Sequence, residues 1–598
     1  MTVLRKLIDL LSYRERVQLG LLFVAVLVMA FLEMVSVASV LPFLSVASDP
    51  SRIQTNEWLR WAYDSLGFTS TNAFLLALAG AALLALIFSN AWMAATHWAQ
   101  IRFALGRSHS LSVRLLGHYL AQPYAFFLRR NSSDFGRNIL AETDQATAVL
   151  IAALRVGAKA MVAVAIIVML VAFDPLLAVI LTTVLGGAYG IIYLLTRQTL
   201  SRLGLVRVDT NGMRYRLAAE AFGAIKDLKL LGREEALLDR FIDPSQRFNR
   251  AQASAIVIGE IPRFALEALA FGGVLTIAVY LILRGEGLQQ TIPVLGLYAF
   301  AGYRLMPSLQ QMFHGYTRMR FGAPAVDNLH RELTEAAAPP RLNAPAFRPS
   351  EARCIAPVPL THQLELDGVT FTYAGTHEPV LRDVTVAIRA NSTIGIVGPT
   401  GSGKTTLVDL VLGLLRPQAG EIRVDGVPLT DGNLRAWQNG LGYVPQHIYL
   451  SDDTIARNIA FGIPDPQIDR EAVERAARIA NIHGFITHDL PKGYETVVGE
   501  RGIRLSGGQR QRIGIARALY HDPSVLVLDE ATSALDNDTE AAVMDAIDEL
   551  AGKRTIIMIA HRLTTLRACD ALLRVREGSV EIDSSRERAT ALVAAGMR

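Results

Sequence analysis

Six long apolar stretches occupy the first 330 residues of this 598-residue chain, and the apolar density falls abruptly after them. Each stretch has about the 20 apolar residues that a helix needs to cross roughly 30 Å of hydrocarbon. A composition that is 51% hydrophobic agrees with membrane segments. The first stretch is too long for the apolar core of a signal peptide, so we expect it to be retained. The predicted spans are 17–46, 73–98, 148–173, 175–196, 254–283 and 288–308.

The loops between these spans differ in their content of basic residues. Residues 102–137 and 197–250 are rich in arginine, whereas the opposite loops carry only Arg52, Arg60 and Arg284. Basic loops favour the cytoplasm, so we expect the N-terminus, both basic loops and everything after the sixth span on that side. Helical patterning continues through the basic loops. The sequence therefore predicts long helical hairpins that project into the cytoplasm.

A proline- and alanine-rich segment follows the sixth span and is typical of a linker. Beyond it, apolar strands such as Thr393–Val397 and Thr555–Ile559 alternate with helical patterns, which predicts an α/β domain. A net charge of only +4 gives no reason to expect nucleic acid as a partner. The predicted parts are a transmembrane domain at 1–330, a linker at 331–361 and a soluble domain at 362–598.

A phosphate-binding loop is predicted at Gly398–Thr405, which fits the pattern G-x-x-x-x-G-K-[ST] directly after a predicted strand. Its backbone N–H groups and the N-terminus of the following helix suit the oxygens of phosphates. In such a loop Lys404 reaches the β- and γ-phosphates, and Thr405 offers its hydroxyl to Mg²⁺. The candidate nucleotide-binding residues here are Gly398, Pro399, Thr400, Gly401, Ser402, Gly403, Lys404, Thr405 and Thr406.

Two adjacent carboxylates, Asp529 and Glu530, end the apolar run Val525–Leu528. We expect Asp529 to hold Mg²⁺, directly or through water, and Glu530 to polarise the attacking water. Shortly before this strand, Ser506, Gly507, Gly508 and Gln509 open a helix that carries several arginines. A serine hydroxyl, glycine N–H groups and a helix N-terminus together predict a second anion site.

The pentapeptide Leu505–Gln509 resembles the signature of ATP-binding cassette (ABC) proteins, and other segments agree with it in their order. The resemblance implies that Tyr373 stacks on adenine and that Gln446 links Mg²⁺ and water to the membrane domain. It also implies that Asp536 belongs to a dimer-contact loop beside the nucleotide and that His561 contacts the γ-phosphate. The catalytic candidates are therefore Glu530, His561 and Gln446, and the metal-binding candidates are Thr405, Gln446 and Asp529.

The family resemblance also implies an architecture and an assembly. The expected fold is an all-α six-helix transmembrane exporter domain with long cytoplasmic hairpins, followed by an α/β P-loop ATPase domain, the ABC nucleotide-binding domain. In this family two cassettes close head to tail, so one set of motifs per chain implies a homodimer, with a heterodimer left open. The implied cofactors are ATP and Mg²⁺. The implied location is the bacterial cytoplasmic (inner) membrane, with the cassette in the cytoplasm.

Two arginines inside predicted spans are the candidate substrate contacts, because an ionisable residue in a span is by default a hypothesis of function. Arg263 has Glu267 four residues later, so a local ion pair is the alternative. Arg304 has no acid nearby on its own helix; it either pairs with Glu33 of the first span or faces a polar cavity. An arginine in such a cavity suits an anionic head group.

The segments 261–267 and 303–308 resemble those of the bacterial flippase for lipid-linked oligosaccharides in protein N-glycosylation. That resemblance implies an anionic lipid-linked partner, a polyprenyl-pyrophosphate oligosaccharide, moved to the outer leaflet. One departure is Ser89 in the second span, where the resemblance implies another arginine. The alternatives left open are export of another lipid or a hydrophobic peptide, and an ATP-gated channel or regulator.

Overall fold

The computed structural model of the chain describes residues 3–173, 175–283, 288–334, 355–531, 537–559 and 569–583. By its internal contacts the chain divides into two units. The first unit contains residues 1–122 and 129–346, and the second contains residues 123–128 and 347–598. The small piece 123–128, which belongs to the first basic loop, therefore groups with the soluble part of the chain.

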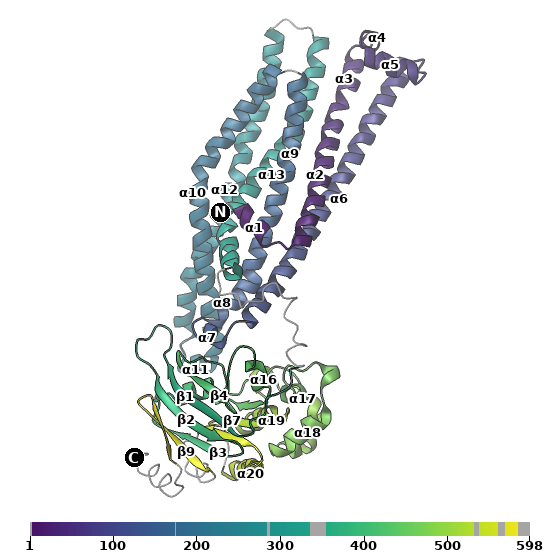
Figure 1. Ribbon diagram of the computed structural model, residues 1–598. Helices are drawn as coiled ribbons and strands as arrows, with labels where there is room; N and C mark the ends of the chain where they lie inside the picture. The colour runs from purple at the N-terminus through teal and green to yellow at the C-terminus, as the bar shows by residue number, and fades with distance from the viewer. Residues whose placement is uncertain are drawn as a thin grey trace. The chain divides into compact units, whose positions relative to one another are not determined.

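The first unit is built from long helices that run alongside one another (Figure 1). Each predicted span lies within these helices. In the described part of the chain, the segments Tyr13–Ser48, Thr71–Leu120 and Ser132–Ala172 are long and apolar enough to cross a membrane by length and composition. The helices are α1 (Val3–Asp9), α2 (Tyr13–Ala38), α3 (Val40–Ser48), α4 (Arg52–Thr55), α5 (Glu57–Ser65), α6 (Thr71–Leu120), α8 (Ser132–Arg137), the π-helical turn η1 (Asn138–Glu142), α9 (Thr143–Phe173), α10 (Pro175–Gly223), α11 (Ile225–Leu231), α12 (Glu234–Leu283) and α13 (Leu288–Thr334).

The predicted extension of the helices beyond the spans is confirmed. Helix α6 has 50 residues, α10 has 49 and α12 has 50. At 1.5 Å per residue, a helix of this length measures roughly 75 Å, more than twice the thickness of the hydrocarbon layer. The hairpins therefore follow from uninterrupted helical patterning in the sequence.

The first predicted span is divided in the structure, because α2 ends at Ala38 and α3 begins at Val40. Pro42 lies in the first turn of α3. It cannot donate a backbone hydrogen bond, and its ring crowds the carbonyl of the residue four positions earlier. The sequence also did not predict α1. The side chains of Ser12 and Glu15 accept hydrogen bonds from each other's backbone N–H groups. This capping box begins α2 as a helix separate from α1.

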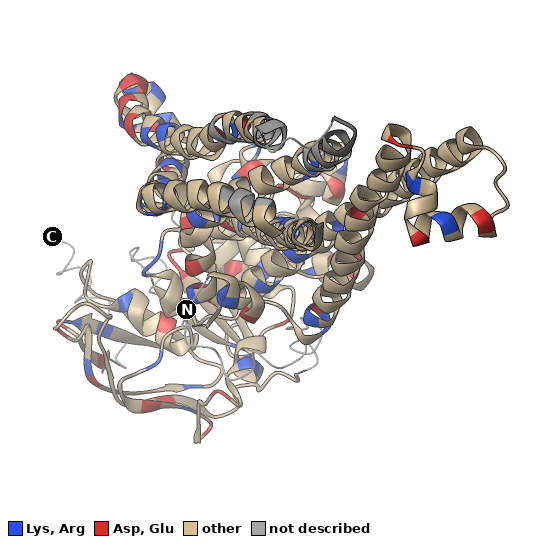
Figure 2. Ribbon diagram, turned by 90° about the horizontal axis from the view of Figure 1, so that it is seen from above, with Lys and Arg blue, Asp and Glu red and all other residues tan. Residues whose placement is uncertain are grey.

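The core of the first unit lies where α2, α9 and α13 meet, with Val26, Val162, Ile166 and Leu305 among its buried residues. Between α3 and α6, the short helices α4 and α5 carry charges of both signs (Figure 2). Phe74 of α6 holds both short helices: its ring meets that of Tyr63 of α5 edge to face at 5.2 Å, and Ile53 of α4 is buried in the same apolar cluster.

In its described residues, the second unit contains two sheets. The four-stranded sheet has the order β2-β1-β4-β5 and is antiparallel. The six-stranded sheet has the order β10-β9-β3-β8-β7-β6 and is parallel except for the β10–β9 pair. The strands are β1 (Gln363–Phe371), β2 (Leu381–Arg389), β3 (Thr393–Val397), β4 (Ala419–Val424), β5 (Val427–Pro428), β6 (Leu441–Val444), β7 (Val525–Asp529), β8 (Thr555–Ile559), β9 (Ala571–Arg576) and β10 (Ser579–Asp583).

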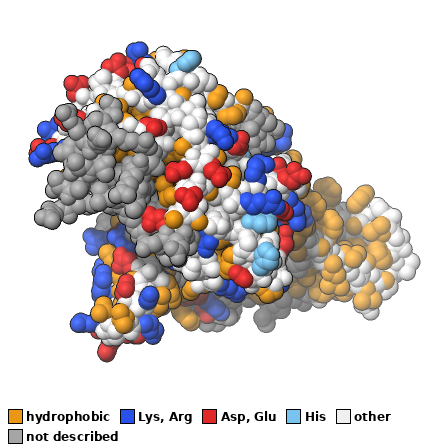
Figure 3. Space-filling view, turned by 90° about the horizontal axis from the view of Figure 1, so that it is seen from below, with side chains coloured by type: hydrophobic (Ala, Val, Ile, Leu, Met, Phe, Trp, Pro, Cys, Tyr) orange, Lys and Arg blue, Asp and Glu red, His pale blue; other side chains and the backbone are white. Residues whose placement is uncertain are grey.

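The helices of the second unit include one from the first basic loop. Ala125 of this helix, α7, packs against the same apolar cluster as Tyr373 and Leu441. The surface of the second unit in Figure 3 carries basic and acidic side chains interspersed, as a surface in water does. The helices are α7 (Tyr124–Phe127), α15 (Lys404–Val411), α16 (Leu434–Asn439), α17 (Ile455–Ile459), η2 (Asp465–Gln467), α18 (Arg470–Ile479), η3 (Phe485–Asp489), η4 (Gly493–Glu495), η5 (Glu500–Gly502), α19 (Gly507–Leu519) and α20 (Asn537–Asp548).

The parallel part of the six-stranded sheet positions the candidate site. Strands β7 and β8 are buried along their whole length, which explains why they are continuous apolar runs in the sequence. Parallel strands place their carboxyl ends at one edge of the sheet. The phosphate loop after β3 and the carboxylates at the end of β7 therefore lie at the same edge.

Candidate functional site

The loop Gly398–Gly403 joins β3 to the N-terminus of α15, which is the arrangement that the motif requires. Gly403 has a φ of +106°, a conformation that a residue with a side chain rarely adopts. At Gly398, a Cβ atom would lie 2.3 Å from the carbonyl oxygen of Val575. Only glycine therefore fits at these two positions, and the loop backbone can approach a ligand closely.

Lys404, at the start of α15, folds back over the loop. Its Nζ donates to the carbonyl oxygens of Gly398 and Pro399, each at 2.9 Å. Burial lowers the pKa of Lys404, and the charges of Glu530 and Asp529 act in the opposite direction. The ammonium group is thus held at the loop and close enough to feel both carboxylates.

The loop passes a direct test of fit for a phosphate. The hydroxyl of Ser402 is buried and has no hydrogen-bond partner within the described structure. A buried hydroxyl without a partner costs free energy unless a ligand or water supplies one. An oxygen-rich anion in the loop would provide this partner, as it would for the backbone N–H groups at the start of α15.

Glu530 stands at a sharp turn directly after β7. Its φ is +49°, a left-handed conformation that costs a residue other than glycine about 1–3 kcal/mol. Two glutamines hold the turn: Gln446 Nε2 donates to the Glu530 carboxylate at 2.8 Å, and Gln511 Nε2 donates to the Glu530 carbonyl at 3.3 Å. The structure thus brings together Gln446 and Glu530, which the sequence placed in separate segments.

Asp529, the last residue of β7, is buried, with 6% of its surface exposed. A second buried carboxylate, Asp409, lies on α15 and was not expected from the sequence. Burial, and then the charge of Asp529, raises the pKa of Asp409 to about 6. The one signal that could have identified Asp409 is an acid between apolar residues in the second half of the helix that follows the phosphate loop.

Tyr373, the candidate adenine platform, is held on two sides. Its hydroxyl lies 3.0 Å from the Thr406 hydroxyl of α15, and its ring meets Phe371 edge to face at 5.0 Å. The phosphate loop and the tyrosine are therefore linked by a direct contact, which the sequence spacing alone could not show. Stacking of adenine on this ring stays a prediction.

Ser506 caps the N-terminus of α19, and Gln509 completes a capping box with it. Within the described residues, no hydrogen bond joins Ser506–Gln509 to the phosphate loop of the same chain. Two further candidates, Asp536 and His561, lie outside the described residues. The signature segment thus has the helix N-terminus and the serine cap of the predicted second anion site. In the described residues this segment is not hydrogen-bonded to the phosphate loop.

The two candidate arginines of the first unit both have acidic partners. Arg263 Nε lies 2.9 Å from Glu267 Oε1 at an exposed position, which is the local pair considered as the alternative. Arg304 Nη1 lies 3.5 Å from Glu33 Oε1 and 3.4 Å from Asn90 Oδ1. Glu33 Oε2 and Arg304 Nε are buried without hydrogen-bond partners in the described structure. The Arg304–Glu33 pair is therefore incompletely satisfied.

Comparisons with known proteins give consistent results for the two parts of the chain. Residues 18–300 match the family described as the ABC transporter transmembrane region, and residues 381–533 match the family described as the ABC transporter. The ATP-dependent lipid A-core flippases of Escherichia coli (strain K12) and Shigella flexneri are each 32% identical over 476 residues, covering 78% of this chain and 78% of theirs. A solved bacterial Atm1-family ABC exporter with ATP bound superposes with a TM-score of 0.76 at 24% identity, covering 97% of this chain and 98% of that one.

Proposed function

This chain belongs to the ABC transporter family, with the organisation of a half-transporter, and from that premise we propose that it acts as a homodimeric lipid flippase of the bacterial inner membrane. ABC exporters hydrolyse ATP, so the chain is an ATPase. The proposed cargo is an amphiphile with an anionic head group, moved from the cytoplasmic to the outer leaflet. The basic loops of the first unit support the cytoplasmic placement of the cassette.

The residues of the second unit support a division of labour in ATP hydrolysis. The loop Gly398–Gly403 and Lys404 bind and orient the phosphates, and Glu530 accepts a proton from the attacking water. Gln446, bonded to Glu530 at 2.8 Å, positions that carboxylate. Thr405 and Asp529 would hold Mg²⁺, which neutralises charge on the phosphates when it is bound.

Two observations support the homodimer. Each chain carries one phosphate loop and one signature segment. Within the described residues, no hydrogen bond joins the phosphate loop to the signature segment of the same chain. With Cys354 and Cys569 replaced, we expect cysteines introduced by Thr400→Cys and Ser506→Cys to cross-link between two chains when ATP is bound. Cross-linking is read from the mass of the product on a denaturing gel. The same protein without nucleotide is the control, and cross-links formed only within one chain would contradict the head-to-tail dimer.

The observation that carries the cargo proposal is the polar cluster of Arg304, Glu33 and Asn90 among apolar helices. An arginine in a span costs several kcal/mol unless a partner or water offsets it. Here one carboxylate, 3.5 Å away, satisfies it only in part. A pyrophosphate offers more oxygens to a guanidinium than this arrangement provides. Together with the resemblance of segments 261–267 and 303–308 to the flippase for lipid-linked oligosaccharides, this makes a polyprenyl-pyrophosphate oligosaccharide the first cargo choice.

A second candidate cargo follows from the relatives. Those that match over 78% of this chain are described as lipid A-core flippases. A lipid of that type with an anionic head group would be recognised by Arg304 through the same charge-assisted hydrogen bonds. The two candidates share the mechanism and differ in the lipid, so one assay with both lipids distinguishes them.

The test measures flipping in proteoliposomes that contain either lipid, with Arg304→Ala as the variant. We expect flipping of the preferred lipid to fall by roughly tenfold or more, the effect of losing a charge-assisted hydrogen bond. Arg304→Lys should recover only part, because lysine keeps the charge but loses the two-pronged geometry. Basal ATP hydrolysis is the internal control, since no nucleotide contact changes.

A purely structural role for Arg304 gives a different result. Removal of Arg304 alone would leave Glu33 buried and unpaired, which lowers the thermal stability. The double variant Arg304→Ala with Glu33→Gln removes that stranded charge. If the double variant is stable and flips lipid at the normal rate, Arg304 has no role in head-group binding and the cargo proposal is wrong.

A further inference from the structure

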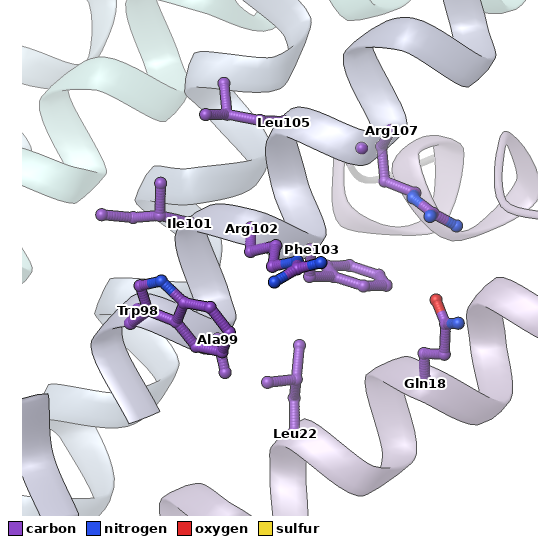
Figure 4. A pocket seen from close by; sticks show the side chains of 10 residues that line it. Gln18, Leu22, Trp98, Ala99, Ile101, Arg102, Phe103, Leu105 and Arg107 are labelled. Carbon is purple, nitrogen blue, oxygen red and sulfur yellow. The ribbon is translucent and has the colours of Figure 1, made fainter. Parts of the chain in front are cut away.

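A cavity of about 800 Å³ lies between α2 and α6 of the first unit, away from the Arg304 cluster. Figure 4 shows Gln18 and Leu22 of α2 facing Trp98, Arg102 and Phe103 of α6 across this space. Most of its wall is apolar, and the remaining lining residues are Ala99, Ile101, Leu105, Gly106 and Arg107. Neither the nucleotide site nor the proposed cargo site uses these residues.

The cavity lies where the predicted membrane spans of both of its helices end on the side of the basic loops. On α2, the first apolar run begins at residue 17, beside Gln18. On α6, the second apolar run ends at residue 98, which is Trp98 itself. Tryptophan is enriched at the membrane interface, and arginine is enriched just beyond it on the cytoplasmic side. The predicted spans of the two helices thus agree in predicting that this cavity lies at the boundary of the cytoplasmic leaflet.

The two arginines of the cavity differ in their surroundings. Arg107 Nη1 forms a short ion pair with Glu15 Oε1 at 2.6 Å, so its charge is already balanced. Arg102 makes no ion pair in the part of the chain that the structure describes, and its guanidinium lies 5.1 Å from the centre of the Trp98 ring. Stacking on an aromatic ring orients a guanidinium and leaves its N–H donors available.

We propose that this cavity binds a phospholipid of the cytoplasmic leaflet through its anionic head group. The head-group phosphate would contact Arg102, and the first part of an acyl chain would lie against Leu22 and Ala99, on the side of the cavity toward the apolar runs. The apolar wall beside one unbalanced cation is complementary to a molecule with an anionic head and an apolar tail. Arg304, Glu33 and Asn90 of the proposed cargo site do not line this cavity, so the two sites can be tested separately.

The test measures binding of phosphatidylglycerol to the purified full-length protein by native mass spectrometry, with phosphatidylcholine as the neutral comparison. We expect Arg102→Ala to weaken phosphatidylglycerol binding by roughly tenfold or more. Arg102→Lys should restore part of it, since lysine keeps the charge. The matched control is Arg14→Ala, which removes an exposed arginine of α2 that does not line the cavity. Because it removes only general electrostatic attraction to anionic lipid, it should lower the affinity for phosphatidylglycerol by no more than about fivefold.

A second variant tests the apolar wall without changing charge. Gly106 lines the cavity, and a Cβ atom there would meet no atom within 4 Å, so Gly106→Leu adds apolar side-chain volume at this wall. We expect this variant to lose phosphatidylglycerol as Arg102→Ala does. Because leucine also favours the helix more than glycine, loss of binding would not come from unfolding of α6.

Four outcomes would overturn the proposal. The first is that Arg102→Ala and Arg14→Ala weaken phosphatidylglycerol binding equally, and the second is that phosphatidylcholine binds as tightly as phosphatidylglycerol. The third is that inorganic phosphate displaces the lipid at a concentration similar to that of the lipid. The fourth is that Gly106→Leu dissociates the dimer. The third would indicate a site for a free anion, and the fourth a surface covered by a second copy of the chain. The readouts are lipid binding and the mass of the complex, so failure of the proposed transport function would not affect them.

Discussion

Replacing Glu530 with glutamine is expected to lower the rate of ATP hydrolysis by at least ~10²-fold, since it removes the general base. Glutamine has the same shape as glutamate and can still bond to Gln446, which lies 2.8 Å from the carboxylate. Binding of MgATP should therefore persist. The measurements are steady-state phosphate release and equilibrium binding of a fluorescent ATP analogue, both on the full-length protein.

Two further variants make the Glu530→Gln result specific. Lys404→Ala removes the ammonium group at the loop and should weaken nucleotide binding itself. Glu474→Gln makes the same chemical change on α18, at a residue whose partner is Arg478 one turn away, and should leave both measurements unchanged. If the Glu530→Gln variant hydrolyses ATP at the normal rate, Glu530 is not the general base.

Removal of Arg207 is expected to destabilise the first unit by about 3–5 kcal/mol, which is typical of breaking a buried ion pair. Arg207 Nη2 lies 2.7 Å from Glu142 Oε2, and the two side chains are 5% and 0% exposed. The pair joins α10 to the π-helical turn η1 before α9. In Arg207→Ala the Glu142 carboxylate is left buried without its cation. The measurement is the thermal unfolding of the full-length protein in detergent.

Two comparisons distinguish a stranded charge from a general loss of packing. The double variant Arg207→Met with Glu142→Leu replaces both charges by apolar groups and should recover most of the stability. The exposed pair Lys229–Glu234, at 3.0 Å, should contribute only about 0–1 kcal/mol when its lysine is removed. If Arg207→Ala unfolds at the wild-type temperature, the pair does not hold these helices together.

The polar atoms around Glu530 illustrate what sequence spacing cannot supply. The sequence identified Gln446 and Glu530 separately, each from the pattern of its own segment. Their hydrogen bond depends on β6 and β7, which are neighbours in the sheet but distant in the chain. The second bond, from Gln511 to the Glu530 carbonyl, depends on the position of helix α19. Asp409 was missed for the same reason, since its raised pKa depends on burial and on Asp529.

Prediction of the cargo was limited in a similar way. The sequence left two environments open for Arg304, a polar cavity or a pair with Glu33. The structure places Glu33 Oε1 3.5 Å away. The resemblance to the flippase of protein N-glycosylation is not confirmed by the comparisons, which support an ABC exporter with lipid flippases among its relatives.

The sequence by itself determined the features that depend on neighbouring residues. Apolar runs of membrane length, the unbroken patterning that extends α6 from Thr71 to Leu120, and the glycine loop before Lys404 are all encoded within single segments. Only the tertiary structure decided which charges meet, because an ion pair or a cavity forms between segments that the chain brings together from far apart. That holds for Arg304 with Glu33, for Arg207 with Glu142, and for the cavity beside Arg102.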